Sequence, residues 1–331
     1  MEKNISRRDF FQKSALATAG AIVATTPLMA NIPLDNQKKK KSAPTDKLNI
    51  AGIGIGGRGG GVIREMNSEN IVALCDVDWK YAGPQLEAYP NAKKYKDFRK
   101  MFDEMGSQID AVVVGTADHT HAVIAARALS MGKHVYCEKP LTHTVYETRL
   151  LTRLAAKQKV ATQMGNQGAS GNGVRQICEA IWSGMIGEVT RVEAFTDRPI
   201  WPQGLETPTE VHTPHPELDW DLFIGPAPYR PYNQIYHPWN WRGWWDFGTG
   251  ALGDMACHIL QPAVKALNLK SPVAVQGSST ALMTDCAPNA QIAKFIFPAR
   301  DNMPKVGMPR VEVTWYDGGL LPEYPKGWPA G

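Results

Sequence analysis

Leu48-Asn49-Ile50-Ala51-Gly52-Ile53-Gly54-Ile55-Gly56-Gly57-Arg58-Gly59-Gly60-Gly61-Val62 decides the fold, because an apolar run breaks there into six glycines within eight positions. This pattern predicts a strand that leads into a phosphate-binding turn and a helix. A dinucleotide pyrophosphate needs backbone N–H groups that no Cβ shields, at the positive end of a helix dipole. Gly54-x-Gly56-x-x-Gly59 supplies such positions. Gly52-x-Gly54-x-x-Gly57 fits as well, but the later frame leaves Asn49–Ile53 intact as the strand.

A glycine turn by itself is a weak signal, and a glycine-rich surface loop is the alternative. A dinucleotide site also requires a second strand that ends in an acid about 20 residues further on. The segment Ile71–Cys75 is such a strand, and Asp76 follows it 22 positions after Gly54. Together, the two strands, the glycines and the acid favour a dinucleotide-binding domain.

Length, composition and charge indicate an ordinary globular protein. The chain has 331 residues, of which 43% are hydrophobic and 21% charged, so it has room for two domains with substantial cores. The net charge is only +4, and four of the positive charges lie together at Lys38–Lys41. We therefore expect neither a nucleic-acid partner nor a membrane-surface partner.

The first 30 residues are typical of an export signal. Arg7 and Arg8 precede the apolar run Ala15–Thr26, and Leu28-Met29-Ala30 offers a small-residue cleavage site. The order resembles a twin-arginine signal, and the apolar run is too short and too mild for a transmembrane anchor. We expect residues 1–30 to be removed, residues 31–46 to be a linker, and the protein to be periplasmic or otherwise exported. The five cysteines are widely spaced and predict no disulfide framework.

Strand-like and helix-like segments alternate between residues 47 and 168. Such alternation predicts a doubly wound, parallel α/β sheet of the Rossmann type, with ligands beyond the carboxyl ends of its strands. Residues 115–119 and Glu138-Lys139-Pro140 should then face the same crevice as the glycine turn. From residue 169 to 331 the pattern changes to strands separated by long loops, with one helix expected at Gly250–Leu267. This part predicts an α+β domain with an open, mainly antiparallel sheet.

Two features beyond the glycine turn point to chemistry. Asp254 and His258 are four residues apart, which places them on one face of the expected helix, where an acid can orient a proton-transferring histidine. Lys139 directly follows a strand end, where its amine can bond an alcohol oxygen during oxidation. Each has a plain structural alternative, namely a helix-capping acid with a packed histidine and a solvated surface lysine.

The combination of these residues resembles the Gfo/Idh/MocA oxidoreductases. The shared residues are Gly54-x-Gly56-Gly57-x-Gly59, Asp76, Glu138-Lys139-Pro140 and Gly250-x-x-x-Asp254-x-x-x-His258, in the same order, and the resemblance covers about residues 47–316. It implies that Lys139, Asp254 and His258 form the catalytic group, with His258 exchanging the hydroxyl proton while hydride passes to nicotinamide. It also implies that Asp76 accepts the adenosine ribose hydroxyls, which favours NAD over NADP. Arg58 leaves the second possibility open, since an arginine in that turn can meet a 2′-phosphate.

Further candidates lie at the ends of the expected strands. Thr116 and His119 could contact the cofactor, and His121 is expected to cap the helix that follows. Asn166 and Gln167 could touch ribose or nicotinamide. Each of these residues could equally be an ordinary turn residue. With the residues of the resemblance, the predicted cofactor set comprises Gly54, Gly56, Gly57, Arg58, Gly59, Asp76, Thr116, His119, Glu138, Lys139, Asn166 and Gln167.

The segment between Asp219 and Asp246 holds five of the ten tryptophans. Aromatic faces beside charged hydrogen-bonding groups suit sugar rings, although a packed loop or a subunit interface would have the same composition. We predict a small sugar as substrate and a homo-oligomeric protein. The predicted substrate-binding residues are Arg198, Trp201, Trp241, Arg242 and Trp245. A metal site at His212, His215 and His237 lacks a partnering carboxylate pattern, so no metal is predicted.

Three functions are consistent with the sequence. The first is an NAD-dependent oxidoreductase that acts on a ring carbinol of a sugar and holds its cofactor tightly, since export removes it from the free nicotinamide pool. The second is a redox-assisted, NAD-dependent glycosidase of the same fold. The third is a dinucleotide-binding sensor without turnover, against which the presence of Lys139, Asp254 and His258 argues. Family members also continue well beyond residue 331, so the resemblance predicts that the C-terminal domain is incomplete here.

Overall fold

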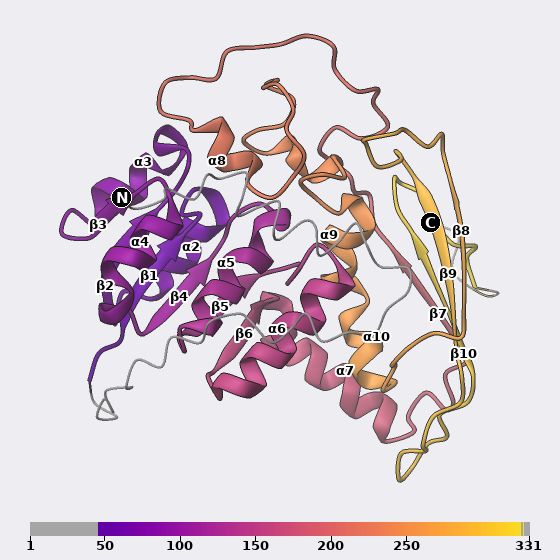
Figure 1. Cartoon of the computed structure of the whole chain (residues 1–331). Coiled ribbons are helices and arrows are strands. Elements are labelled where there is room, and N and C mark those ends of the chain that lie inside the picture. The colour runs from indigo at the N-terminus through magenta and orange to yellow at the C-terminus, as the bar shows by residue number, and fades with distance from the viewer. Residues whose placement is uncertain (1–45, 326, 328–331) are drawn as a thin grey trace, which may run out of the picture. The chain divides into compact units, whose positions relative to one another are not determined.

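The computed structural model describes residues 46–325 and 327, which form two compact units (Figure 1). The first unit contains the described residues up to Gln163 together with His212–Tyr232, and the second contains Met164–Val211 and the described residues from Asn233 onward. The predicted twin-arginine signal lies outside the described residues, as does nearly all of the predicted linker.

A six-stranded sheet forms the centre of the first unit. Its strands are β1 (Asn49–Ile53), β2 (Asn70–Cys75), β3 (Lys93–Tyr95), β4 (Ala111–Val114), β5 (His134–Glu138) and β6 (Thr162–Gly165), in the spatial order β3-β2-β1-β4-β5-β6. The pairs β1–β2, β1–β4, β2–β3 and β4–β5 are parallel. The strand order reverses at β1, and ligands bind at such a switch point in doubly wound sheets. The predicted Rossmann sheet is confirmed.

Helices follow most of these strands. They are α2 (Gly57–Glu65), α3 (Trp79–Ala88), α4 (Phe98–Met105), α5 (Asp118–Ser130) and α6 (Val145–Gln158), with a 3₁₀ turn, η1 (Gly106–Gln108). Asp78 and Asp97 accept N–H bonds at the starts of α3 and α4, and Thr144 with Glu147 forms a capping box on α6. These side chains fix where the helices begin.

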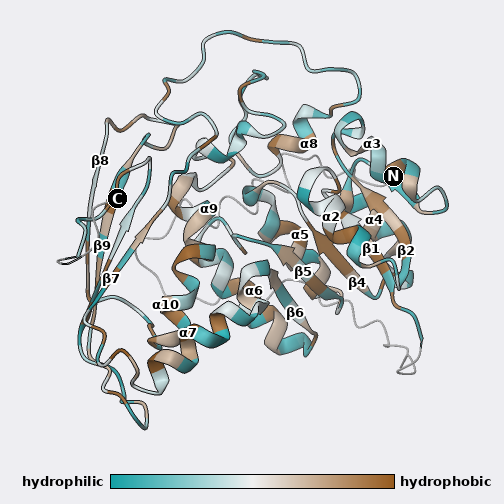
Figure 2. Ribbon diagram, turned by 180° about the vertical axis from the view of Figure 1, so that it is seen from behind, coloured by the Kyte–Doolittle hydropathy of each residue, from teal (hydrophilic) through white to brown (hydrophobic). Residues whose placement is uncertain are grey.

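Apolar side chains from alternate strand positions feed two cores. Ala51, Ile53, Val112 and Val114 pack with α4, α5 and α6, whereas Ile50 and Val113 pack with α2 and α3. Figure 2 shows the corresponding hydrophobic colour of β1, β4 and β5. Burial on both sides explains why these strands are continuous apolar runs and not alternating ones.

Residues 212–232, which we call the strap, join the first unit although they are remote from it in sequence. The short helix α8 (Trp220–Ile224) lies within the strap, near α3 in both views (Figures 1 and 2). The main chain of the strap pairs with the loop after β2, because Asp219 N–H donates to Val77 O at 2.9 Å and Trp79 N–H to Glu217 O at 3.3 Å. The composition of residues 212–232 did not predict that they join the first unit, because only contacts with residues distant in sequence place them there.

The second unit contains a four-stranded mixed sheet. Its strands are β7 (Arg191–Phe195), β8 (Ala274–Ser279), β9 (Gln291–Phe297) and β10 (Val311–Tyr316), in the order β7-β10-β9-β8. The pairs β8–β9 and β9–β10 are antiparallel and β7–β10 is parallel, so the predicted mainly antiparallel sheet is confirmed.

Helices α7 (Asn172–Trp182), α9 (Gly250–Ile259) and α10 (Gln261–Ala266) pack against this sheet, and the 3₁₀ turns η2 (Gln167–Ser170) and η3 (Asn240–Gly243) complete the unit. The single helix predicted over Gly250–Leu267 is wrong in one respect, because it breaks at Leu260. Pro262 stands in the first turn of α10 and supplies no N–H to continue the ladder of α9. Among the described residues, no helix is both long enough and apolar enough to cross a membrane.

Candidate active site

The glycine turn after β1 has no room for side chains. Gly54 has a φ of +73°, and a Cβ on it would stand 2.5 Å from Thr116 N. A Cβ on Gly59 would lie 1.9 Å from Gly54 O, and one on Gly115 would lie 2.6 Å from Gly59 Cα. Strand β1, helix α2 and the turn after β4 therefore meet backbone to backbone, and Gly115 belongs to this contact although the motif does not include it.

Helix α2 starts at this turn without a side-chain cap. Gly56 is its N-cap residue, it supplies no side-chain hydrogen bond, and no acid stands in the first turn. Helix N-termini leave N–H groups without intrahelical partners, and the helix dipole makes them attractive to anions. The turn therefore fits the pyrophosphate of a dinucleotide, which needs bare main chain at a helix N-terminus.

Asp76 holds the turn from the side of β2. Its carboxylate accepts N–H bonds from Ile55 at 2.8 Å, from Gly56 at 3.0 Å and from Asp78 at 2.9 Å. Burial raises the pKa of Asp76, and the three backbone bonds oppose that rise. Two of the bonds use Oδ2 and one uses Oδ1, so one lone pair of Oδ1 has no partner among these bonds. The side chain thus acts as a brace for the turn and can still accept one ligand hydroxyl.

Tyr81 lies against the same turn. A Cβ on Gly56 would approach the Tyr81 ring within 2.3 Å, and one on Gly57 would come within 2.6 Å of the Tyr81 hydroxyl oxygen. The Tyr81 side chain is 42% exposed, on α3. Its ring therefore forms a wall beside the turn, and it makes glycine necessary at both positions.

Arg58 connects the glycine turn to the end of β5. Its Nε donates to Glu138 Oε1 at 3.1 Å, and Glu138 is buried while the Arg58 side chain is 40% exposed. Lys139 follows directly and is half-buried. The structure therefore brings Gly54, Gly56, Gly57, Arg58, Gly59, Asp76, Glu138 and Lys139 to the carboxyl edge of one sheet.

The turn after β4 lies at the same edge. The Thr120 hydroxyl bonds the Thr116 hydroxyl at 2.8 Å, and His119 Nε2 lies 2.9 Å from Phe223 O of the strap. The His119 and Phe223 rings are 5.6 Å apart between centroids. His119 is thus packed under the strap, which also reaches the loop after β2 through His215 Nε2 and Asp78 Oδ2, 3.2 Å apart.

His121 does not cap helix α5, so that prediction is wrong. The N-cap residue of α5 is Ala117, and His121 lies in the first turn with both ring nitrogens turned to main-chain oxygens. Nδ1 is 2.7 Å from Pro140 O and Nε2 is 3.0 Å from Thr116 O. A helix cap would require a position before the helix, whereas this ring reaches across to two neighbouring turns.

In the second unit, Asp254 forms an ion pair with Arg242. Arg242 Nε lies 3.4 Å from Asp254 Oδ1, and both side chains are largely buried. The guanidinium carbon stands 4.0 Å from the Trp239 ring centroid and 4.3 Å from that of Trp241. A cation between aromatic faces gains attraction from both rings. Arg242 is therefore held between two rings and an acid, and its contact with Asp254 was not part of the substrate-binding prediction.

Other predicted residues of the second unit have mixed surroundings. Trp201 is buried and donates to Gln203 Oε1 at 2.8 Å, whereas Trp245 is 40% exposed. Arg198 lies 3.8 Å from Asp197 in an ion pair. His258 shares the face of α9 that carries Asp254, as the spacing of four residues requires.

Asn166 and Gln167 follow β6 and differ in burial. Asn166 is 5% exposed and its amide nitrogen donates to Cys257 O at 2.5 Å, while its amide oxygen has no hydrogen-bond partner within the part of the chain that the structure describes. Gln167 is exposed. Asn166 thus ties the end of β6 to α9 next to His258, and its buried oxygen is suited to accept a hydrogen bond from a bound ligand.

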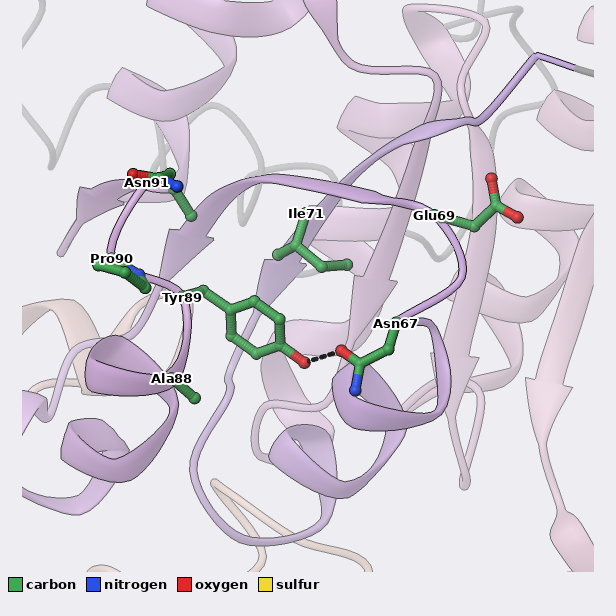
Figure 3. Close-up of a pocket in the computed structure, with 8 residues that line it drawn as sticks. Asn67, Glu69, Ile71, Ala88, Tyr89, Pro90 and Asn91 are labelled. Carbon is green, nitrogen blue, oxygen red and sulfur yellow. Dashed lines mark hydrogen bonds between the residues drawn. The ribbon is translucent and has the colours of Figure 1, made fainter.

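A separate pocket lies at the opposite end of β2 (Figure 3). Asn67, Glu69 and Tyr89 line it, and the Tyr89 hydroxyl donates to Asn67 Oδ1. One carboxylate oxygen of Glu69 accepts a hydrogen bond from the N–H of Leu48, the residue before β1. None of the described glycines lines this pocket, in contrast to the turn after β1. Over residues 46–325 and 327, no cluster of three or more His, Cys, Asp or Glu side chains is arranged for a metal ion.

Sequence reasoning missed Gly115, Tyr81, His121 and the strap as parts of the site. Gly115 carried a signal, because a glycine directly after the apolar strand β4 faces the glycine turn in a doubly wound sheet. The others act through contacts between distant segments and have no spacing rule.

The fold and the glycine turn define a two-unit protein whose first unit is a dinucleotide-binding Rossmann domain. The profile described as "Oxidoreductase family, NAD-binding Rossmann fold" matches residues 47–166, and "Oxidoreductase family, C-terminal alpha/beta domain" matches residues 170–294. The chain therefore belongs to the Gfo/Idh/MocA oxidoreductase family. The predicted membership and NAD-binding domain are confirmed.

Curated relatives match part of their length. An inositol 2-dehydrogenase of Salmonella typhimurium is 29% identical over 142 residues, which cover 41% of this chain and 42% of that protein. A glycosyl hydrolase family 109 protein of Shewanella pealeana is 23% identical over 209 residues, covering 57% of this chain and 45% of the relative. The chain thus spans less than half the length of these two relatives.

Solved structures share the fold. GenD2 from gentamicin A biosynthesis, in complex with NAD, has a TM-score of 0.59 at 18% identity, covering 86% of this chain and 70% of the other. The WlbA dehydrogenase of Bordetella pertussis, in complex with NADH and UDP-GlcNAcA, has a TM-score of 0.59 at 17% identity, covering 84% and 74%. At these identities, the likeness concerns the fold.

Proposed function

We propose that the protein is an NAD-dependent oxidoreductase that removes hydride from a ring carbinol of a sugar or sugar derivative. The observation that carries this proposal is the glycine turn, which offers an uncapped helix N-terminus and is braced by the buried carboxylate of Asp76. Lys139 stands at the same sheet edge, and Asp254 and His258 share a face of α9. A sensor without turnover would have no use for these three side chains.

Each residue has a role that its chemistry permits. When bound, NAD supplies the hydride acceptor. The backbone N–H groups at the start of α2 hold its pyrophosphate, and the remaining lone pair of Asp76 Oδ1 accepts a ribose hydroxyl. Thr116, His119, Asn166 and Gln167 are proposed as further cofactor contacts, since all lie within five residues of the carboxyl ends of the strands β4 and β6.

The substrate alcohol requires a donor to its oxygen and an acceptor for its proton. We assign the first to the Lys139 ammonium and the second to the His258 imidazole, whose protonated form Asp254 stabilises. Arg242 holds the Asp254 carboxylate in place through their ion pair. Trp201, Trp241, Trp245 and Arg198 are proposed to contact the sugar, whose C–H faces stack on aromatic rings.

The test begins with protein purified without added cofactor, denatured and assayed for released NAD(H). The intact protein is then offered a panel of sugars, cyclitols and aryl glycosides while absorbance of reduced nicotinamide is followed. The proposal expects bound or bindable NAD and formation of a ketosugar. Failure to bind NAD, or NAD binding without conversion of any panel member, contradicts it.

A redox-assisted glycosidase is the second candidate, and the match to the glycosyl hydrolase family 109 protein favours it. In that reaction the hydride removed from a ring carbon is returned after elimination of the glycosidic substituent and addition of water. Aglycone release from an aryl glycoside with no net change in NADH would select this function over the dehydrogenase.

We further propose export by the twin-arginine route and a homo-oligomeric assembly. The support for export is the order of Arg7, Arg8 and the apolar run. Replacing both arginines by lysine should retain the protein inside the inner membrane, as cell fractionation can measure. Light scattering of the purified protein tests the assembly, and a monomeric mass contradicts it.

A further inference from the structure

His121 occupies a position that the proposed function does not use. Its ring is 1% exposed and lies between two backbone turns. One turn is that of Thr116, directly after β4, and the other is that of Lys139 and Pro140, directly after β5. The two ring nitrogens point to Pro140 O at 2.7 Å and Thr116 O at 3.0 Å.

The two contacts together determine the protonation state. A carbonyl oxygen only accepts hydrogen bonds, and a neutral imidazole has one N–H donor and one lone pair. If the ring were neutral, one nitrogen would direct its lone pair at a carbonyl oxygen at hydrogen-bond distance, which is repulsive. Only the imidazolium, with two N–H groups, satisfies both oxygens.

The surroundings have opposing effects on this charge. Burial lowers the pKa of His121, but the neighbouring Cys137 thiol and the two carbonyl oxygens outweigh that effect, so the pKa is raised. Asp118, a buried acid, precedes His121 in the first turn of α5, where the positive end of the helix dipole acts against a cation. Cys137 lies on β5, immediately before Glu138 and Lys139.

We propose that His121 is a positioning residue which, as a buried imidazolium, ties the Lys139–Pro140 turn to the Thr116 turn. The main chain at Pro140 is held through its carbonyl, one residue after Lys139, so the ring restricts where the Lys139 backbone can lie. The same ring fixes Thr116, which borders Gly54 of the glycine turn. We call the His121 ring and its two carbonyl contacts the clamp. The effect of the clamp on turnover rests on the proposed function of Lys139, whereas the existence of the clamp does not.

Nitrogen-15 NMR of histidine side chains tests the clamp without any substrate. In a pH titration, histidines of ordinary pKa lose their second ring proton near pH 6.5. The signal of His121, assigned by its loss in His121→Gln, should keep two protonated ring nitrogens to a higher pH than that, because its pKa is raised. A His121 ring that becomes a neutral tautomer at or below about pH 6.5 means that one of the two contacts is not a donated hydrogen bond, and it overturns the proposal.

Hydrogen exchange supplies the second test. In His121→Gln, both N–H donors sit on one amide nitrogen and cannot span the two carbonyls as Nδ1 and Nε2 of the ring do, so peptides that contain residues 114–118 and 138–142 should exchange about tenfold faster. The matched control is His143→Gln, which changes the same residue type in the loop after Pro140 but leaves the clamp in place. Equal exchange in both variants contradicts the clamp.

Kinetics then separate positioning from mere folding. With a panel member that the wild-type protein converts, His121→Gln should lower kcat by about tenfold or more while the NAD Kd changes less than about threefold. His143→Gln should change neither. If the wild-type protein converts no panel member, the proposed function fails while NMR and exchange still decide the clamp. If exchange is faster but kcat is unchanged, the contacts of His121 hold the backbone without affecting turnover, and the positioning role is refuted.

Discussion

The two ends of one sheet edge are held by buried ions of opposite sign. At the β1–β2 end, the Asp76 carboxylate collects three backbone N–H groups. At the β4–β5 end, the His121 ring faces two backbone carbonyl oxygens. Each charged side chain forms hydrogen bonds with backbone groups of the turn beside it. The charge of each buried side chain therefore matches the backbone groups that its turn presents, negative for N–H groups and positive for carbonyl oxygens.

The two ends also differ in what they offer a ligand. The Asp76 end offers the bare N–H groups of a helix start, which suit an anion. The His121 end offers a side chain, Lys139, from a turn whose main chain is fixed. We therefore expect changes at the first end to affect cofactor binding and changes at the second to affect turnover.

The largest expected effect is on turnover at the His121 end. Lys139→Ala should lower kcat by about a thousandfold, because it removes the donor to the developing alkoxide, while NAD binding persists. His258→Ala, a change in helix α9 of the second unit, should lower kcat to a similar degree through loss of the proton acceptor. Steady-state kinetics with a converted sugar and a parallel NAD titration check this. Full activity in either variant refutes its assignment.

The next largest effect is on stability and NAD binding at the Asp76 end. Gly59→Ala would place a Cβ 1.9 Å from the backbone oxygen of Gly54, and we expect it to lose about 3 kcal/mol of unfolding free energy and to abolish NAD binding. Gly61→Ala is the matched control, since its Cβ would meet nothing closer than 3.7 Å. In helix α2 it should be neutral or stabilise by up to about 1 kcal/mol. Urea denaturation and calorimetry measure both, and equal behaviour of the two variants would contradict the packing argument.

A smaller effect is expected when the brace keeps its shape but loses its charge. Asp76→Asn presents an NH₂ group where the carboxylate accepted N–H bonds, while it relieves the burial of a charge. The net loss should be about 1–2 kcal/mol of unfolding free energy, with weaker NAD binding. Asp110→Asn is a useful comparison, because within the part of the chain that the structure describes Asp110 accepts one backbone N–H, that of Asn49. A Kd for NAD that is unchanged in Asp76→Asn would remove the residue from the cofactor site.

The smallest effect is the pH dependence of stability that His121 brings. Its pKa is raised in the folded protein, so its contribution is fully present below the ordinary histidine pKa of about 6.5 and is lost as pH rises through the folded pKa. Unfolding free energy should therefore fall more steeply above about pH 6.5 in the wild-type protein than in His121→Gln. Denaturation at a series of pH values gives the difference between the two slopes. Parallel slopes would show that folding does not raise the pKa of His121.

The sequence predicted those parts of the molecule that follow a local rule. Gly54, Gly59 and Asp76 keep a fixed spacing because phosphate binding and strand geometry demand it, and the apolar strands β1 and β4 are long enough to be recognised. The break between α9 and α10 was missed even though Pro262 signals it, because the apolar pattern continues across the break. Short β3, with two exposed lysines, carried no hydrophobic pattern.

What escaped prediction depends on segments distant in sequence. His121 has the same local surroundings as a capping histidine, and its role appears only when Pro140 O and Thr116 O lie on either side of the ring. The aromatic composition of the segment around Arg242 suggested sugar binding. The structure shows in addition that Arg242 forms an ion pair with Asp254. The strap pairs with the loop after β2 from more than 130 positions away, as His215 and Asp78 show.

Hydrogen exchange of the protein with and without NAD⁺ shows where the cofactor binds. If the cofactor lies on the glycine turn, peptides that contain residues 54–59 should gain protection when NAD⁺ is added, and those lining the pocket of Figure 3 should not. Unchanged exchange at residues 54–59 under saturating NAD⁺, or protection confined to that pocket, would show that NAD⁺ does not bind at the glycine turn.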